Sequence, residues 1–183
     1  MFDLTKIKKL GDIPKVQAGL RPDYTAQIFQ GRASTYKELD ERSNQIANRL
    51  IECGLEKQAR IGFIGKNSDR YFELLFGACK ANIVLVGVNW RLAPPEMQYI
   101  LKDAACKILF IGKEYEGLVE DIRKECPTIN EVVGMDSSDF GGSVIDNWFE
   151  NSSVDEPIVE INGHDDVLQL YTSGTTGHPK GVQ

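Results

Sequence analysis

The sequence predicts an α/β protein in which strands alternate with helices, forming a mainly parallel sheet with helices on both faces. Short runs of aliphatic and β-branched residues recur along the chain, as in "RIGFIG" (60–65), "IVLVGV" (83–88) and "KILFIG" (107–112). Stretches of helical length and capping chemistry separate these runs. The run at 83–88 is apolar at consecutive positions, which is typical of a parallel strand covered on both faces. The alternating order favours crossover connections within one sheet.

The clearest helix is expected in "STYKELDERSNQIANRLIECG" (34–54). Thr35 and Glu38 have the spacing of a capping box, which satisfies two backbone donors at the start of a helix. Apolar residues recur on one face, and Gly54 stands where a left-handed residue ends many helices. The preceding "YTAQIFQGRA" (24–33) is β-leaning and broken at Gly31, so we expect a hairpin or an edge strand.

The next helices are marked by their first residues. Asn67 and Ser68 are candidate caps for "DRYFELLFGACKA" (69–81), and Pro94 opens "PPEMQYILKDA" (94–104). A further helix, "YEGLVEDIRKE" (115–125), and a strand, "EVVGM" (131–135), repeat the alternation. From Asp136 the chain becomes turn-rich and acidic, which predicts a surface excursion with one short helix at 144–149. The last predicted strand is "DVLQLYTS" (166–173).

Composition and charge narrow the class of protein. The length of 183 residues favours about one domain. Lysine plus arginine total 21 against 27 acidic residues, a net charge of −6, and no basic stripe of the kind that binds nucleic acid is present in the sequence. The charged N-terminus lacks a signal-peptide core, and the longest aliphatic run is far shorter than the ~20 residues of a membrane span. These features predict a soluble cytoplasmic protein without a transmembrane segment.

The four cysteines are scattered along the chain, at Cys53, Cys79, Cys106 and Cys126. They form no C-x-x-C pair and no spacing with histidine that would suggest a metal site. We therefore expect small buried thiols in a reducing compartment.

The C-terminal stretch "LYTSGTTGHPKGVQ" (170–183) carries the strongest functional signal, and three interpretations compete. Small polar residues are common in flexible tails. A Walker A loop requires Lys followed by Ser or Thr, whereas Lys180 is preceded by Pro179 and followed by Gly181. A different phosphate loop is the third interpretation. Backbone N–H groups would converge at Gly174 and Gly177, and hydroxyls and one ammonium would complete the cradle.

The string "YTSGTTGHPKGV" resembles the phosphate-binding signature of the adenylate-forming (AMP-binding) superfamily, which includes acyl-CoA synthetases, adenylation domains and luciferases. It fits [ST]-[ST]-G-[ST]-[ST]-G-x-P-K-G at every fixed position. The blocks at 34–68 and 72–110 are also similar to that family, and "VNWRL" is closer to acyl- and aryl-CoA synthetases. Two positions depart from the family's usual pattern: Asn82 replaces a common Gly, and Gly87 replaces a frequent Pro. Asn82 still tolerates a left-handed turn.

The resemblance implies a set of site residues and cofactors. Lys180 is the expected catalytic cation, Thr172 the expected ligand of Mg²⁺, and ATP and coenzyme A the expected co-substrates. The residues expected to hold the ATP phosphates are Thr172, Ser173, Gly174, Thr175, Thr176, Gly177 and Lys180.

The function implied is that of an ATP-dependent acyl-CoA synthetase, which forms an acyl-AMP from a carboxylic, most readily fatty, acid and passes the acyl group to coenzyme A. The family pairs a large N-terminal domain with a small C-terminal one. Residues 1–183 are therefore expected to be the first part of the large domain and, alone, to lack turnover. An amino-acid or aryl-acid adenylation domain and a non-catalytic nucleotide-phosphate-binding module stay open as alternatives, as does a homodimer of the full-length enzyme.

We expect structural roles for the other residues whose side chains could take part in catalysis or metal binding. His164 and His178 have no Ser or Cys nucleophile nearby in the sequence that would suggest a hydrolase triad. The "HDD" run at 164–166 suits capping or solvated charge better than metal binding, because adjacent residues in a turn point in different directions. Asn89 and Arg91 are expected to hold a turn, and both tryptophans, at positions 90 and 148, to serve in packing.

Overall fold

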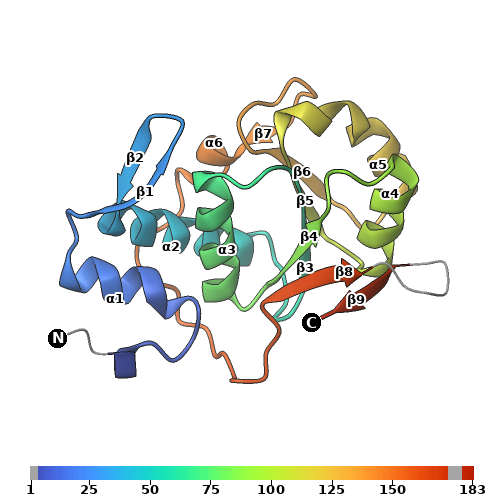
Figure 1. Ribbon diagram of the computed structural model, residues 1–183. Coiled ribbons are helices and arrows are strands. Elements are labelled where there is room, and N and C mark those ends of the chain that lie inside the picture. The colour runs from blue at the N-terminus through green and yellow to red at the C-terminus, as the bar shows by residue number, and fades with distance from the viewer. Residues whose placement is uncertain (1–3, 173–178) are drawn as a thin grey trace. The chain divides into compact units, whose positions relative to one another are not determined.

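The computed structural model describes residues 4–172 and 179–183, and its chain divides into two units (Figure 1). We call them the sheet unit and the helical unit. The sheet unit consists of Leu55–Lys66, Ile83–Trp148 and Asp166–Gln183. The helical unit consists of Met1–Gly54, Asn67–Asn82 and Phe149–Asp165. Each unit is therefore built from three separate stretches of the sequence.

Among the described residues, seven strands form the sheet, in the order β7-β6-β5-β3-β4-β8-β9. Their bounds are Arg60–Ile64 (β3), Val84–Val88 (β4), Ile108–Ile111 (β5), Glu131–Gly134 (β6), Ser143–Val144 (β7), Leu168–Thr172 (β8) and Lys180–Val182 (β9). Neighbouring strands are parallel except β8 and β9, which pair antiparallel at the edge. Consecutive apolar residues in β3, β4 and β5 are buried, as expected for strands covered on both faces.

Helices of the sheet unit pack on both faces of the sheet. Helices α4 (Pro94–Asp103) and α5 (Val119–Glu125), the latter preceded by the 3-10 helix η2 (Lys113–Leu118), share one apolar core with the strands. Leu109 and Ile111 of β5 belong to that core. Phe110, between them, faces the opposite side, where the ring of Trp148 in α6 (Ile145–Phe149) packs edge-on at 5.2 Å. The predicted α/β fold with a mainly parallel sheet is thereby confirmed.

The helical unit begins with η1 (Leu4–Lys6) and α1 (Asp12–Leu20), followed by the hairpin of β1 (Thr25–Phe29) and β2 (Arg32–Thr35). Helix α2 (Tyr36–Glu52) starts with the predicted capping box, in which the Thr35 hydroxyl accepts from the Glu38 N–H and the Glu38 carboxylate accepts from the Thr35 N–H. Helix α3 (Asp69–Ala81) is capped by Ser68 and ends on Asn82 in the left-handed conformation. The predicted tolerance of Asn82 for this turn is confirmed.

Helices α2 and α3 cross at Gly77. A Cβ atom there would lie 2.5 Å from Ile46 Cγ2 and 2.7 Å from Ile46 Cβ, so the close approach requires glycine. On one side of the crossing, Lys80 Nζ donates to Asp40 Oδ1 at 2.6 Å, to Ser43 Oγ at 2.8 Å and to Asn44 Oδ1 at 2.7 Å. A fully hydrogen-bonded ammonium is the condition under which a buried lysine is tolerated.

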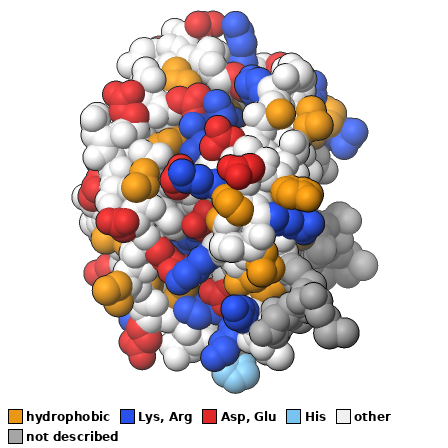
Figure 2. All heavy atoms as spheres, turned by 90° about the vertical axis from the view of Figure 1, so that its left-hand side faces the viewer, with side chains coloured by type: hydrophobic (Ala, Val, Ile, Leu, Met, Phe, Trp, Pro, Cys, Tyr) orange, Lys and Arg blue, Asp and Glu red, His pale blue; other side chains and the backbone are white. Residues whose placement is uncertain are grey.

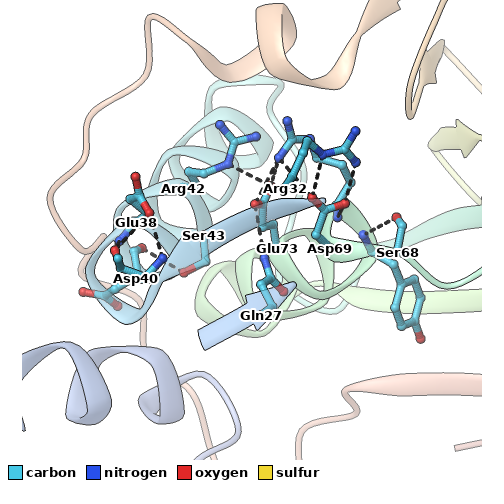
Figure 3. A network of polar contacts seen from close by, with 12 residues as sticks. Gln27, Arg32, Glu38, Asp40, Arg42, Ser43, Ser68, Asp69 and Glu73 are labelled. Atoms are coloured by element: carbon cyan, nitrogen blue, oxygen red, sulfur yellow. Dashed lines mark hydrogen bonds and ion pairs between the residues drawn. The ribbon is translucent and has the colours of Figure 1, made fainter. Parts of the chain in front are cut away.

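On the other side of the crossing lies a network of arginines and carboxylates (Figure 3). Glu73 is buried and forms ion pairs with Arg42 at 2.9 Å and with Arg70 at 3.2 Å. Arg32 of the hairpin donates two hydrogen bonds to Asp69, at 3.0 and 2.9 Å. Two ionic clusters thus flank the helix crossing, one on each side of Gly77.

The predicted surface excursion is held against α2. Side-chain amides of Asn44, Gln45 and Asn48 donate to backbone carbonyls of residues 150–155. The N-terminal helices η1 and α1 were not predicted from the sequence, and other details differ as well. Strand β7 was not foreseen, β9 folds back beside β8, and the stretch 113–125 starts as a 3-10 helix before it becomes α-helical.

Candidate functional site

The carboxyl ends of the parallel strands lie at one edge of the sheet, where open α/β sheets bind their ligands. Four segments follow these ends within the sheet unit. Lys66 lies beyond β3, Asn89–Trp90–Arg91 beyond β4, and Glu114 and Tyr115 beyond β5. Strand β8 ends at Thr172, where the phosphate-loop motif begins.

The antiparallel pair of β8 and β9 forms the base of this motif. Thr172 is the direct partner of Lys180, Tyr171 of Gly181, and Leu170 of Val182. Directly paired residues project to the same face of a sheet, so Thr172 and Lys180 share one face. Both are exposed, and Leu170 and Val182 on that face are 49% and 52% exposed. The two residues that carry a hydroxyl and an ammonium are therefore paired on one exposed face of the hairpin.

The remaining predicted phosphate-binding residues, Ser173, Gly174, Thr175, Thr176 and Gly177, lie outside the described residues, as does His178. Their assignment therefore stays a prediction from the sequence. Within the described ranges, the structure brings two of the predicted site residues together, Thr172 and Lys180.

The opposite face of the hairpin is held by a chain of hydrogen bonds. The Tyr171 hydroxyl donates to Asp103 Oδ2 at 2.6 Å and accepts from Gln169 Nε2 at 3.1 Å. Gln169 Oε1 in turn accepts from Arg60 Nε at 3.1 Å. Burial and the neighbouring Asp103 carboxylate both raise the pKa of Tyr171, so its hydroxyl stays protonated and serves as a donor at neutral pH.

Little room is left for a side chain at Gly181, on this face of the hairpin. A Cβ atom at that position would lie 2.7 Å from Gln169 Nε2 and 3.3 Å from Tyr171 Cζ. The glycine after Lys180 in the motif therefore leaves room for the side chains of the adjacent strand.

A cationic and aromatic cluster lies beyond β4 at the same edge. The Arg91 guanidinium lies 4.0 Å from the centroid of the Trp90 ring, and Lys66 Nζ lies 5.5 Å from it. Lys66 also pairs with Glu114 at 3.1 Å. The Asn89 side chain accepts from the Arg91 N–H at 3.0 Å, which confirms the predicted turn. Trp90 therefore contacts two cationic side chains, a role that the predicted packing function does not include.

The other candidates have structural roles in the described part of the chain. Asp165 accepts from Asn82 Nδ2 at 2.8 Å and from the Asn162 N–H at 2.7 Å, while His164 is exposed. Trp148 is buried and donates to Glu131 at 3.0 Å. Burial raises the pKa of the Cys79 and Cys106 thiols to about 12, so these cysteines are poor nucleophiles.

Charge is mixed on the face of the molecule that Figure 2 presents. Figure 2 shows basic and acidic side chains interspersed over the face it presents, with apolar side chains scattered among them. Among residues 4–172 and 179–183, no three His, Cys, Asp or Glu side chains are grouped to hold a metal ion. None of the described helices has the length and apolar character needed to cross a membrane.

Sequence reasoning missed the residues that support the hairpin from behind, namely Tyr171, Gln169, Arg60 and Asp103. Tyr171 and Asp103 are 68 positions apart, so no local pattern reveals their contact. Lys66 could have been identified from the sequence, because it is a charged residue just beyond a predicted buried strand.

Known proteins resemble the chain along nearly its whole length. ScoC of Streptomyces coeruleorubidus, a fatty acid–[acyl-carrier-protein] ligase, is 38% identical over 161 residues, which are 88% of this chain and 30% of that protein. FadD13 of Mycobacterium tuberculosis, a long-chain-fatty-acid–CoA ligase, is 33% identical over 172 residues, 92% of this chain and 32% of that protein. The crystal structure of the anthranilate CoA ligase AuaEII with anthranoyl-AMP superposes with a TM-score of 0.88 at 27% identity, over 95% of this chain and 34% of that one.

The chain spans about a third of the length of the curated relatives it matches, 30% of ScoC and 32% of FadD13. A sequence model of the family described as AMP-binding enzyme matches residues 15–183. The phosphate-loop signature, the parallel sheet and this match agree, and the chain belongs to the AMP-binding enzyme family.

Proposed function

We propose that the protein carrying this chain activates a carboxylic acid with ATP and transfers the acyl group to coenzyme A. The observation that supports this most is the β8–β9 hairpin, which places Thr172 beside Lys180 at the carboxyl end of a parallel strand. The relatives ScoC and FadD13 are both named as fatty-acid ligases, which favours a fatty acid as the substrate.

In this proposal the hairpin binds the β- and γ-phosphates of ATP while the acid attacks the α-phosphate. The carboxylate and the triphosphate are both anions, so catalysis needs positioned positive charge and hydrogen-bond donors. Lys180 supplies an exposed ammonium. Backbone N–H groups of residues 174–177 and the hydroxyls of Ser173, Thr175 and Thr176 supply donors.

Thr172 fits the role of a Mg²⁺ ligand. Mg²⁺ prefers oxygen ligands and is commonly held by one or two protein groups together with phosphates and water. Thr172 is exposed and is paired with Lys180 of the neighbouring strand, and its hydroxyl offers such an oxygen. The bound ion would offset phosphate charge during pyrophosphate release.

The 183 residues form, in this proposal, the first part of the large N-terminal domain. The coverage of about a third of each relative supports this division. Residues outside this chain would then supply the acyl pocket and the nucleoside contacts. The isolated chain is accordingly expected to form no acyl-CoA.

A carrier protein is a second candidate acceptor, because the 38% identical relative ScoC is named as a ligase of fatty acids to acyl carrier protein. An aryl acid is the competing substrate class, favoured by the superposition on an anthranilate CoA ligase. Both alternatives keep the adenylation step and change only the acid or the thiol.

The test is substrate-dependent ATP–pyrophosphate exchange by the complete gene product across fatty, aryl and amino acids. We expect exchange to require Mg²⁺ and to be strongest with a fatty acid. Coenzyme A and acyl carrier protein, added separately to the active acid, distinguish the acceptor. Absence of exchange with every acid would contradict the proposal.

A further inference from the structure

The hydroxyl of Tyr171 connects the strand that leads into the phosphate loop with the far end of helix α4. We infer that Tyr171 is a positioning residue, which holds the β8–β9 hairpin, and with it Thr172 and Lys180, in place through Asp103. This inference rests on the proposed function, because it assigns the hairpin to ATP binding.

The position of Asp103 is the first argument. Asp103 is the last residue of α4, where the helix dipole disfavours a carboxylate and favours a cation. Its Oδ2 accepts from the Tyr171 hydroxyl at 2.6 Å, the length expected of a charge-assisted hydrogen bond between a hydroxyl and a carboxylate. The contact with Tyr171 offers a reason for an acidic residue at an electrostatically unfavourable site.

The direction of the Tyr171 hydroxyl is also fixed. Gln169 Nε2 donates to the phenolic oxygen at 3.1 Å, and Gln169 Oε1 accepts from Arg60 Nε at 3.1 Å. With its oxygen accepting from Gln169, the Tyr171 O–H is left to donate to Asp103. The chain of bonds therefore runs from the first residue of β3, across β8, to the end of α4.

Packing extends the effect of Tyr171 to the second strand of the hairpin. Gly181 lies directly opposite Tyr171, and a Cβ there would be 3.3 Å from the Tyr171 ring and 2.7 Å from Gln169 Nε2. Lys180 immediately precedes Gly181, and Thr172 immediately follows Tyr171. The Tyr171 ring thus packs against Gly181, and Thr172 and Lys180 are the chain neighbours of this pair.

Loss of the Tyr171–Asp103 bond should therefore impair use of ATP more than use of the acid. Small displacements of positioned groups reduce rates strongly, and hydrogen bonds to charged groups are among the stronger ones. For Tyr171→Phe we expect kcat/KM for ATP in the ATP–pyrophosphate exchange reaction to fall on the order of 10-fold. The fall should come chiefly from a higher KM for ATP, while KM for the acid is unchanged.

The experiment compares Tyr171→Phe, Asp103→Ala, Asp103→Asn and the double variant Tyr171→Phe/Asp103→Ala in the complete gene product. Asp103→Asn keeps a side-chain oxygen that can accept from Tyr171, so it should retain most of the ATP affinity that Asp103→Ala loses. The double variant should have a KM for ATP no higher than that of the more impaired of Tyr171→Phe and Asp103→Ala. Tyr24→Phe, which removes the hydroxyl of an exposed tyrosine in the helical unit, is the matched control and should leave KM for ATP unchanged.

Amide hydrogen exchange of residues 180–182 provides a readout that does not depend on activity. Faster exchange there in Tyr171→Phe, but not in Tyr24→Phe, supports the anchoring of the hairpin. Equal increases in KM for ATP and in KM for the acid, or unchanged amide hydrogen exchange at residues 180–182, would overturn the positioning role. Suppose that Tyr171→Phe speeds hydrogen exchange at 180–182 but the wild type catalyses no ATP–pyrophosphate exchange with any acid. That result would overturn the proposed function and leave Tyr171 as a structural anchor.

Discussion

The two units of the chain are stabilised by different chemistry. In the sheet unit, strands β3 to β6 bury consecutive apolar residues, of which alternate ones pack against α4 and α5, and the core is almost wholly apolar. In the helical unit, the crossing of α2 and α3 is flanked by buried Glu73 and Lys80, each with partners of opposite charge. The first kind of stability comes from area removed from water, and the second depends on individual partners.

This difference indicates which substitutions should destabilise each unit most. An apolar core tolerates exchanges of similar volume, usually for less than about 1.5 kcal/mol. A buried charge that loses its partner is left without the water that would otherwise solvate it. The helical unit should therefore respond sharply to substitutions that change one charge.

The largest expected effect is that of Lys80→Ala. The Lys80 side chain is only 2% exposed, and its removal leaves Asp40, Ser43 and Asn44 without their shared donor. We expect the free energy of unfolding to fall by roughly 3–5 kcal/mol, as for other broken buried pairs. Urea denaturation measures this quantity directly.

The matched control for Lys80 is Lys37→Ala, which removes an exposed ion pair with Glu41 on helix α2. We expect that change to cost no more than about 0.5 kcal/mol. Similar costs for both variants would show that the buried cluster contributes no more than a surface pair.

A smaller loss is expected from Gly77→Ala at the helix crossing. The new methyl group would overlap Ile46, and overpacking of this kind costs about 1–3 kcal/mol, partly offset by the higher helix propensity of alanine. Gly19→Ala in α1 is the opposite case, because nothing lies within 4 Å of its Cβ position. That variant should gain about 0.5–1 kcal/mol, and thermal melting of the pair would show opposite shifts in Tm.

A further effect concerns pH and distinguishes the helical unit from the sheet unit. Burial raises the pKa of Glu73 above 4.5, although Arg42 and Arg70 oppose the shift. The folded state therefore holds the Glu73 proton more tightly than the unfolded state. The stability that this proton contributes is fully present below pH 4.5 and is lost as the pH rises through the folded pKa.

Compared with Glu73→Gln, the wild type should accordingly lose stability as the pH rises above 4.5, by about 1.4 kcal/mol for each unit of pKa shift. Chemical denaturation at a series of pH values gives the two curves. Ile111→Val in the sheet unit should cost about 0.5–1.5 kcal/mol and run parallel to the wild type at every pH. A Glu73→Gln curve parallel to the wild type would argue against a raised pKa.

The same contrast explains how much the sequence could predict. The Thr35–Glu38 capping box and the buried parallel strands depend on local patterns and were predicted, and the β1–β2 hairpin was one of two structures expected for its region. The Lys80–Asp40 and Tyr171–Asp103 contacts join residues 40 and 68 positions apart, and only the folded chain brings them together. Strand β9 was missed for a similar reason, since its three residues acquire strand geometry by pairing with β8.

For the candidate site, the sequence predicted the motif and the structure supplied its base. Thr172 and Lys180 were expected to bind the same ligand, and the hairpin places them opposite each other. The support behind them, from Gln169 and Asp103, could not be predicted because it depends on how β8 lies beside helix α4.

The central claim is that Lys180 supplies charge to the phosphates of ATP during adenylation. ATP–pyrophosphate exchange by the complete gene product, compared between wild type and Lys180→Ala, tests it most directly. Loss of one donor from a site where charge develops typically costs about 10²–10³ in rate, and we expect a loss of that size with unchanged thermal stability, because Lys180 is exposed. Exchange at the wild-type rate in Lys180→Ala would contradict the claim.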